Sequence, residues 1–263
     1  MALHPLVSGF AEVADDYEHG RPGYPPEAVA AAARGLGLAP GARIADVGAG
    51  TGKLTRALVA GGFDVVAVEP LPGLRERLRA AAPGVEALAG TAEALPLPDA
   101  SVDAIACADA FHWFDGPPAV AEFARVIRPG GGLALLWHME DDEDEPPPWQ
   151  VELGDLLERV RPEHPSWTDG HEQGRGAVAA SPAFGPLVLD EIRHEQATDR
   201  DRLIAQVASM SFVGALPGPE RHRVLARVAA LLDRHGVRDV PMAARTTVWT
   251  ARRIEAPRSA MTR

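Results

Sequence analysis

The sequence has very few cysteines and lysines, and no long apolar run. Its 263 residues include one cysteine, Cys107, so no disulfide can form within the chain, and a reducing compartment is expected. No apolar stretch approaches the roughly 20 residues that a membrane-spanning helix needs, which excludes a membrane-embedded function. The residues after Met1 lack a basic region followed by an apolar core, so we expect no secretion signal and a cytoplasmic location.

Positive charge is also scarce. The chain has 26 Lys and Arg residues against 37 Asp and Glu residues, and its formal net charge is −11 at pH 7. Such a charge repels the phosphates of nucleic acids and of anionic membranes, so we expect neither as a partner. The length is typical of one large globular core with additions. We therefore expect a small-molecule partner and a monomer or homodimer.

Strand-like and helix-like segments alternate over the first half of the sequence. A helix is predicted at 25–38, where prolines are tolerated in the first turn and glycines stand near the end. Strands are then predicted at 42–48, 64–70, 85–90, 101–109 and 132–139, and helices at 53–62, 71–84 and 117–131. Alternation of this kind implies right-handed crossovers, and it predicts a parallel sheet with helices on both faces.

The composition changes after His138. An acidic, proline-rich stretch at 139–150 predicts a loop or lid; a helix at 151–160 follows, and then a region rich in Gly, His and Pro. Further strands are predicted at 187–196 and 244–253, and further helices at 201–212 and 219–236. We therefore divide the chain into an N-terminal cap (1–36), a core (37–139 and 187–255), a lid or substrate insert (140–186) and a disordered tail (256–263).

The first strand runs into a glycine-rich turn, with the sequence IADVGAGTGKLT at 44–55. A phosphate-binding P-loop needs a glycine five residues before Gly52 and a hydroxyl directly after Lys53, where this chain has Val47 and Leu54. The dinucleotide fingerprint GxGxxG needs a glycine at the position of Lys53. The turn therefore matches neither of these two phosphate-binding patterns.

The turn instead has a GxGxG pattern, which resembles motif I of the class I S-adenosylmethionine-dependent methyltransferases. The resemblance implies S-adenosylmethionine as cofactor, a nucleoside without phosphates whose ribose and amino-acid end the glycine backbone can approach closely. It also implies a Rossmann-like, doubly wound α/β fold with a helical N-terminal cap and a lid insert. Its seven strands would be mostly parallel, the last antiparallel, in the order 3-2-1-4-5-7-6. The implied cofactor contacts in this turn are Asp46, Gly48, Ala49, Gly50 and Gly52.

Further motifs follow in the order of that family. Glu69, with Pro70 after it, ends the second strand, where its carboxylate can accept both ribose hydroxyls. The stretch 90–115 resembles the family segment that holds adenine and then reaches the substrate. It implies adenine contacts from Thr91, Ala92 and Glu93, although many relatives have Asp in place of Thr91, and it implies contacts to the methionine end from Asp109 and Ala110.

The segment YEHGRPGYP at 17–25 resembles the YxxxRPxYP element of one branch of small-molecule methyltransferases, in which it closes over the cofactor. The resemblance implies that Arg21 pairs with the methionine carboxylate and that Tyr17 or Tyr24 covers the sulfonium through its ring face. The alternative is a proline-rich turn with an exposed arginine.

The acceptor is expected just beyond the fourth strand. His112 titrates near neutral pH and can take a proton from a hydroxyl, so it is our candidate catalytic residue; the alternative is that it packs in the pocket wall. Candidate substrate-binding residues are Tyr24, Trp113, His138 and Trp149, while His164, Trp167 and His171 are candidates for a lid.

These observations predict methyl transfer from S-adenosylmethionine to a small molecule, by O-methylation of a hydroxyl or carboxylate, in secondary metabolism. One alternative is a nicotinamide-dependent Rossmann oxidoreductase, which the GxGxG spacing and the lack of a Tyr-xxx-Lys pair oppose. Another is a non-catalytic protein that binds the cofactor. The acidic run at 140–145 resembles a magnesium site, but consecutive acids in a loop are usually solvated, so we predict no metal.

Overall fold

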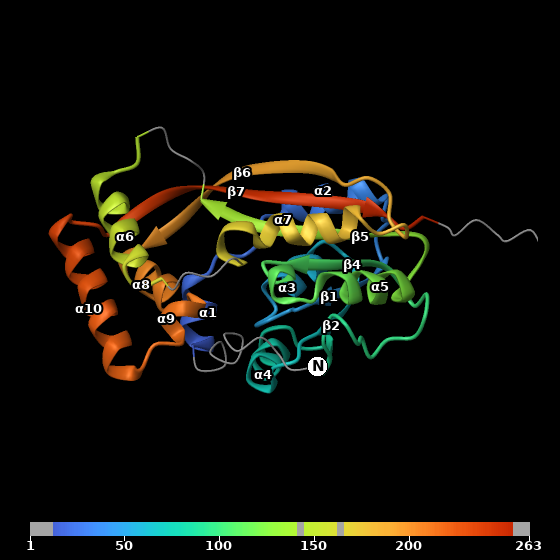
Figure 1. Ribbon diagram of the computed structural model, residues 1–263, viewed down its shortest axis with the longest axis horizontal. Coiled ribbons are helices and arrows are strands. Elements are labelled where there is room, and N and C mark those ends of the chain that lie inside the picture. Colours follow the sequence, from blue (N-terminus) through green and yellow to red (C-terminus); the bar gives the residue numbers. More distant parts are fainter. Residues whose placement is uncertain (1–12, 141–144, 162–165, 255–263) are drawn as a thin grey trace, which may run out of the picture.

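A computed structural model describes residues 13–140, 145–161 and 166–254 of the chain (Figure 1). Its centre is a seven-stranded sheet with the order β3-β2-β1-β4-β5-β7-β6. The strands are β1 (Arg43–Val47), β2 (Asp64–Val68), β3 (Glu86–Leu88), β4 (Val102–Ala108), β5 (Ile127–Glu140), β6 (Val188–Asp199) and β7 (Asp239–Arg252). The first five strands pair in parallel, and β7 is antiparallel to both of its neighbours. The predicted fold class and strand order are therefore confirmed.

Helices cover both faces of the sheet. They are α1 (Ala14–Gly20), α2 (Pro26–Leu36), α3 (Lys53–Ala60), α4 (Pro72–Ala81), the short 3-10 helix η2 (Phe111–Trp113), α5 (Gly116–Val126), α6 (Pro148–Glu158), α7 (Ser166–Ala179), α8 (Arg200–Ala208), α9 (Ser211–Gly214) and α10 (Gly218–Arg234). Helices α2 and α3 pack on one face, and α5 and α7 pack on the other. None of the helices in the described part of the chain is long and apolar enough to cross a membrane.

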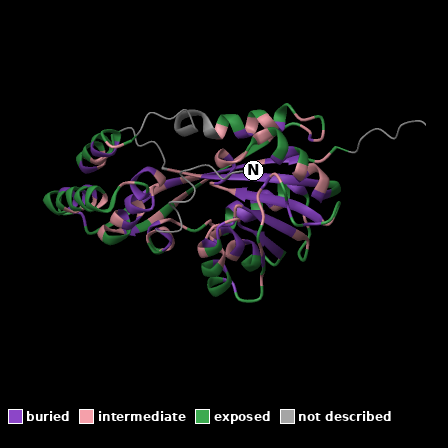
Figure 2. Ribbon diagram, turned by 60° about the horizontal axis from the view of Figure 1, so that its bottom comes forward, coloured by how far each residue is buried: buried purple, intermediate pink, exposed green. Residues whose placement is uncertain are grey.

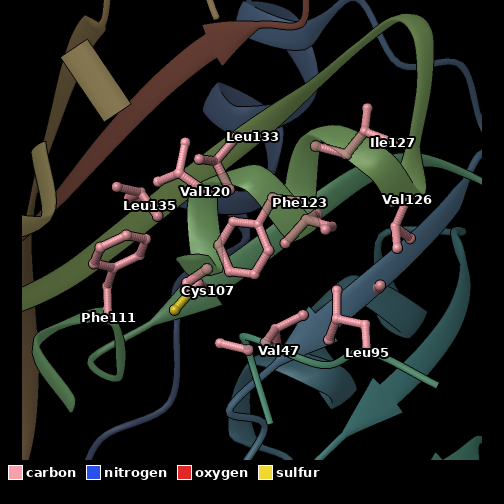
Figure 3. Packing of buried hydrophobic residues seen from close by; sticks show 14 of the residues in the cluster. Val47, Leu95, Cys107, Phe111, Val120, Phe123, Val126, Ile127, Leu133 and Leu135 are labelled. Carbon is pink, nitrogen blue, oxygen red and sulfur yellow. The ribbon is translucent and has the colours of Figure 1, made fainter. Parts of the chain in front are cut away.

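The central strands are buried on both faces, as is expected where helices cover a parallel sheet (Figure 2). On one face, Val120 and Phe123 of α5 pack with Cys107 of β4 and Leu135 of β5 (Figure 3). Cys107 is 1% exposed and forms no disulfide, so it is a core residue. Because this core fixes the strands, it also fixes the loops at their carboxyl ends.

Strands β5, β6 and β7 are the longest of the sheet, and they extend beyond the other strands to a second group of helices (Figure 1). Helices α6, α8, α9 and α10 there enclose their own hydrophobic cluster, which includes Trp149, Leu157, Phe212 and Val228. We call this group the helical cluster. It joins residues from both sides of position 186, where the sequence predicted the boundary between insert and core. The predicted division into domains remains a prediction.

Helices α1 and α7 were not predicted from the sequence. Helix α1 forms within the N-terminal cap, and α7 lies in the region that the sequence describes only as rich in Gly, His and Pro. Helix α7 packs closely against η2 and α5, where the side chain of Val178 is fully buried. It therefore brings part of the predicted insert next to the end of β4. The tail predicted at 256–263 lies outside the described residues.

Candidate functional site

The glycine turn between β1 and α3 has the left-handed backbone that favours glycine. The φ angles of Gly48, Gly50 and Gly52 are +72°, +56° and +86°. A Cβ atom added at Gly48 would lie 2.7 Å from the Cβ of Ala110, and one at Gly52 would lie 2.9 Å from Leu78 Cγ. A Cβ at Gly50 would meet no atom within 4 Å. Gly48 and Gly52 thus serve packing, whereas Gly50 borders open space at the carboxyl end of β1.

Glu69 follows the carboxyl end of β2 and is tied to this turn. Its Oε2 accepts a hydrogen bond from the Gly50 amide at 2.9 Å, and its Oε1 accepts one from the Leu71 amide at 2.9 Å. The side chain is 4% exposed, and burial raises the pKa of the carboxyl above its ordinary value. Arg75 donates to the carbonyl oxygens of Glu69 and Pro70. Each carboxylate oxygen keeps a lone pair for a further donor.

Asp46 lies beneath the turn. It is 1% exposed, and its Oδ2 accepts a hydrogen bond from Thr55 Oγ1 at 2.6 Å. Burial raises the pKa of this carboxyl to about 7, and the nearby Glu69 carboxylate acts in the same direction. Ala49 is buried as well, in a small cluster with Ala67 and Leu78. The side chains of both residues therefore support the turn from within.

Helix α1 is fastened to the same turn by Glu18. Its carboxylate accepts hydrogen bonds from Thr51 Oγ1 at 2.6 Å and from Arg56 Nη2 at 2.7 Å, and its carbonyl accepts one from Lys53 Nζ at 2.8 Å. The sequence analysis missed Glu18, because a single acid on an unpredicted helix carries no local signal. The contact explains how the YxxxRPxYP segment comes to lie beside the glycine turn.

The other residues of that segment face the helical cluster and the end of β4. Arg21 Nε donates to Ser209 Oγ at 3.0 Å, and its guanidinium lies 5.9 Å from the centre of the Tyr17 ring. Burial raises the pKa of Tyr17 to about 12. The Tyr24 hydroxyl donates to Asp109 Oδ2 at 2.6 Å. Burial, followed by the Asp109 carboxylate, raises the pKa of Tyr24 well above its ordinary value. Residues from α1, from the segment between α1 and α2, and from the position just after β4 thus meet at the carboxyl ends of the strands.

Asp109 connects several of the residues that meet at the carboxyl ends of the strands. It directly follows β4 and has a φ of +47°, which is uncommon and unfavourable for a residue other than glycine. Its Oδ1 accepts a hydrogen bond from the His138 amide at 3.1 Å, while its Oδ2 binds Tyr24. Ala110, the next residue, is 8% exposed and contacts Gly48. The carboxylate therefore links the segment before β1 to the end of β5.

The predicted adenine contacts lie on the loop after β3. Ala92 is 2% exposed and belongs to the main core, and Thr91 forms an isolated β-bridge with Ala94. Glu93 Oε1 accepts a hydrogen bond from the Asp115 amide at 2.9 Å. These positions leave the backbone of the loop, more than its side chains, to contact a ligand.

An aromatic group stands just beyond β4. The rings of His112 and Trp113 are 4.8 Å apart; the His171 ring of α7 lies 6.0 Å from His112 and 4.9 Å from Trp137. Burial lowers the pKa of His112 to about 4. Two buried nitrogens in this group, His112 Nδ1 and Trp137 Nε1, have no hydrogen-bond partner among the described residues. Since buried polar atoms are nearly always paired, these nitrogens indicate a ligand or water position.

His138 lies near the end of β5, two residues beyond the last pair that β5 forms with β4. Its Nε2 is 3.2 Å from Gln196 Oε1 of β6, and its ring lies 5.4 Å from the His194 ring. Its Nδ1 is buried and has no partner in the described part of the chain. Burial lowers the pKa of His138. Sequence reasoning missed Gln196, since no motif marks a glutamine on an edge strand.

Other predicted residues do not join these groups. Trp149 is 7% exposed inside the helical cluster, so its surroundings give no reason to place it against an acceptor. His164, residues 141–144 of the acidic run and the side chain of Trp167 lie outside the described residues. Within the described ranges, no group of three or more His, Cys, Asp or Glu side chains is arranged to hold a metal ion.

Comparisons with known proteins agree with this geometry. A methyltransferase domain model matches residues 45–135. The chain is 42% identical over 230 residues to an uncharacterized methyltransferase of Mycobacterium tuberculosis, with 86% of each chain covered. It is 33% identical over 222 residues to an uncharacterized methyltransferase-like protein of Schizosaccharomyces pombe, with 81% of each covered. A solved structure, described as a candidate type II methyltransferase of Anaeromyxobacter dehalogenans, matches with a TM-score of 0.64 and 28% identity, over 90% of this chain and 99% of that one.

Proposed function

This chain belongs to the methyltransferase family, and on that premise we propose that it transfers the methyl group of S-adenosylmethionine to an oxygen of a small-molecule acceptor. The observation that carries the proposal is the contact between Gly50 and Glu69. It joins an open glycine position at the end of β1 to a buried carboxylate at the end of β2. Ligands of open α/β sheets bind at the carboxyl ends of adjacent strands such as these.

The residues present fit this cofactor. The missing side chain of Gly50 leaves room for a ribose to approach the backbone, and the second lone pairs of Glu69 can accept its two hydroxyls. Asp46, Gly48, Ala49, Gly52 and Pro70 shape this half of the site. The loop at Thr91, Ala92 and Glu93 would hold the adenine.

The methionine end would lie between α1 and the end of β4. Arg21 is the residue to pair with its carboxylate, because its Nε bond to Ser209 leaves the other guanidinium nitrogens to face a ligand. Asp109 and Ala110 would border the sulfonium from below, and Tyr17 would cover it with its ring. Glu18 holds this cap against the glycine turn, so it contributes to excluding water.

When bound, S-adenosylmethionine supplies an electrophilic methyl group on sulfur. The chain contributes alignment of the acceptor oxygen with that methyl group and exclusion of water. We place the acceptor among Tyr24, His112, Trp113 and His138, where three elements converge beyond β4. The neutral ring of His112 offers an unpaired nitrogen to it.

Calorimetry of the full chain with S-adenosylhomocysteine and with NAD tests the proposal. We expect S-adenosylhomocysteine to bind at micromolar concentration and NAD not to bind. Binding of NAD alone would establish the oxidoreductase alternative. Binding of S-adenosylhomocysteine without methyl transfer to any member of a broad panel of hydroxyl, carboxylate, amine and thiol acceptors would favour the non-catalytic alternative.

A further inference from the structure

His138 lies close to Asp109, which we assign to the methionine end of the cofactor. Strand β4 pairs with β5 as far as Ala108 and Leu136, so His138 extends beyond the end of β4. Its main-chain amide donates to Asp109 Oδ1, which fixes the backbone that carries the imidazole. The methionine end of the cofactor is placed at Asp109 by the proposed function. His138 therefore lies next to that position, and its ring extends toward Gln196 and His194 of β6.

The hydrogen bond to Gln196 decides which ring nitrogen of His138 carries the proton. With the Gln196 amide oriented so that its Oε1 lies 3.2 Å from His138 Nε2, the ring nitrogen is the donor and the carbonyl oxygen is the acceptor. A neutral imidazole has a single N–H group, and Nδ1 therefore carries a free lone pair. That atom is buried and has no partner among the described residues. His138 Nδ1 can therefore accept a proton from a ligand bound beside it.

The charged and titratable groups around His138 come from three elements. Asp109 at the end of β4 favours the imidazolium, while His194 of β6 and Arg21 after α1 oppose it. His194 is itself engaged, since its Nε2 lies 3.1 Å from Thr246 Oγ1. Burial favours the neutral ring, and the imidazolium that forms after a proton arrives is stabilised by Asp109 and by the Nε2 bond to Gln196.

His112 does not have this arrangement. Its Nδ1 is also buried without a partner, but no hydrogen bond within the described residues fixes its tautomer. The rings of Trp113 and His171 pack beside it. His112 is thus suited to line the acceptor site, whereas His138 has both an oriented ring and a defined free lone pair.

We infer that His138 is the general base of the reaction, with Gln196 as its positioning residue, and that the acceptor is a hydroxyl that is neutral in solution. The inference rests on the proposed function and narrows it. As the acceptor oxygen forms its bond to the methyl carbon, the carbon–sulfur bond breaks and its electron pair stays on sulfur. The hydroxyl proton passes to His138 Nδ1. A carboxylate acceptor is already ionised near pH 7 and needs no base.

The tautomer can be measured without knowing the acceptor. In the full chain with ¹⁵N-labelled histidine and S-adenosylhomocysteine, we expect the NMR signals of His138 to show a protonated Nε2 and an unprotonated Nδ1 at pH 7.5. The signals are assigned by their loss in His138→Ala. In Gln196→Leu the Nε2–H tautomer should lose its dominance. A protonated Nδ1 in the unmodified chain would overturn the inference.

Turnover gives the second test. With a panel of phenols, aliphatic alcohols and carboxylic acids, we expect methylation of a hydroxyl compound, and we expect His138→Ala to lower its kcat by roughly 100-fold or more. In Gln196→Glu the added carboxylate should shift the acidic limb of the kcat profile to higher pH, which a purely structural role would not do. His235→Ala, at an exposed contact with Glu152, is the matched control and should retain full activity.

These measurements distinguish a failure of the proposed methyl transfer from a failure of the role inferred for His138. No binding of S-adenosylhomocysteine would remove the proposed function itself. Binding together with methylation of carboxylates alone, at a rate that His138→Ala leaves unchanged, would overturn the hydroxyl acceptor and the base while the proposed function stands.

Discussion

Replacing Gly50 with alanine should separate cofactor binding from fold stability. The added Cβ would meet no protein atom within 4 Å, so the folded chain has room for it. The φ of +56° still makes alanine unfavourable, at a cost of about 1–2 kcal/mol. In a domain of this size that corresponds to a fall in melting temperature of roughly 2–8 °C. The methyl group would, however, point into the space that we assign to the cofactor.

Gly62 provides the matched control. It follows α3, has a φ of +83°, and an added Cβ there would also meet nothing within 4 Å. Gly62→Ala should therefore lower the melting temperature by a similar amount. Only Gly50→Ala should weaken binding of S-adenosylhomocysteine, by at least about 10-fold or 1.4 kcal/mol.

Calorimetry with S-adenosylhomocysteine and thermal unfolding of the two variants and the parent chain measure both quantities. Equal affinities in all three proteins would refute the assignment of the open space at Gly50. Equal losses of affinity in both variants would show that the effect comes from general destabilisation and not from a contact with the cofactor.

Three further variants test other parts of the site. Glu69→Gln loses one of the two oxygens that accept the Gly50 and Leu71 amides, so S-adenosylhomocysteine should bind about 10- to 100-fold more weakly in calorimetry; unchanged affinity would contradict the assigned role. Burial raises the pKa of Asp46 to about 7 in the folded chain, above its unfolded value of 3.8, so the folded state holds the proton more tightly and stability falls as pH rises between these values. Asp46→Asn should remove that decline, gaining up to about 4 kcal/mol relative to the parent chain between pH 4 and pH 8 in urea unfolding, and parallel curves for the two proteins would refute the burial argument. Trp149→Ala should lower the free energy of unfolding by about 3–5 kcal/mol without changing cofactor affinity, whereas a loss of affinity in a folded variant would place Trp149 at the site after all.

The glycine turn and the strand-end carboxylate that we assign to the donor half could be predicted because local sequence determines them. The left-handed angles at Gly48, Gly50 and Gly52 require glycine, and the spacing of these glycines from Glu69 follows from one crossover between adjacent strands. The alternation of strands and helices predicted a parallel sheet covered on both faces, whereas the strand order was implied by the resemblance to the methyltransferase family. Glu18 could not be predicted, because its partners lie more than 30 residues away and depend on how α1 docks.

Helix α7 illustrates a different difficulty. Its glycines at 174 and 176 lower helix propensity, and its apolar pattern is weak. The helix is stabilised by packing: Gly174 lies against Phe111, and Gly116 of α5 lies against Ala177, at distances that leave no space for larger residues. Trp149 lies in the predicted lid, and the structure buries it in the hydrophobic cluster of α6, α8, α9 and α10, so its assignment to the acceptor stays a prediction.

The two halves of the proposed site therefore differ in which structural features form them. In the proposed site, the donor half is formed by the main-chain conformation at Gly50 and by the Glu69 carboxylate just after the next strand. In the proposed site, the acceptor half draws single side chains from η2, β5, β6 and α7, which only tertiary packing brings together. Because β6 and α7 supply Gln196 and His171 to the proposed acceptor half but no residue to the proposed donor half, we expect substitutions on these two elements to change the acceptor while the affinity for S-adenosylhomocysteine stays the same.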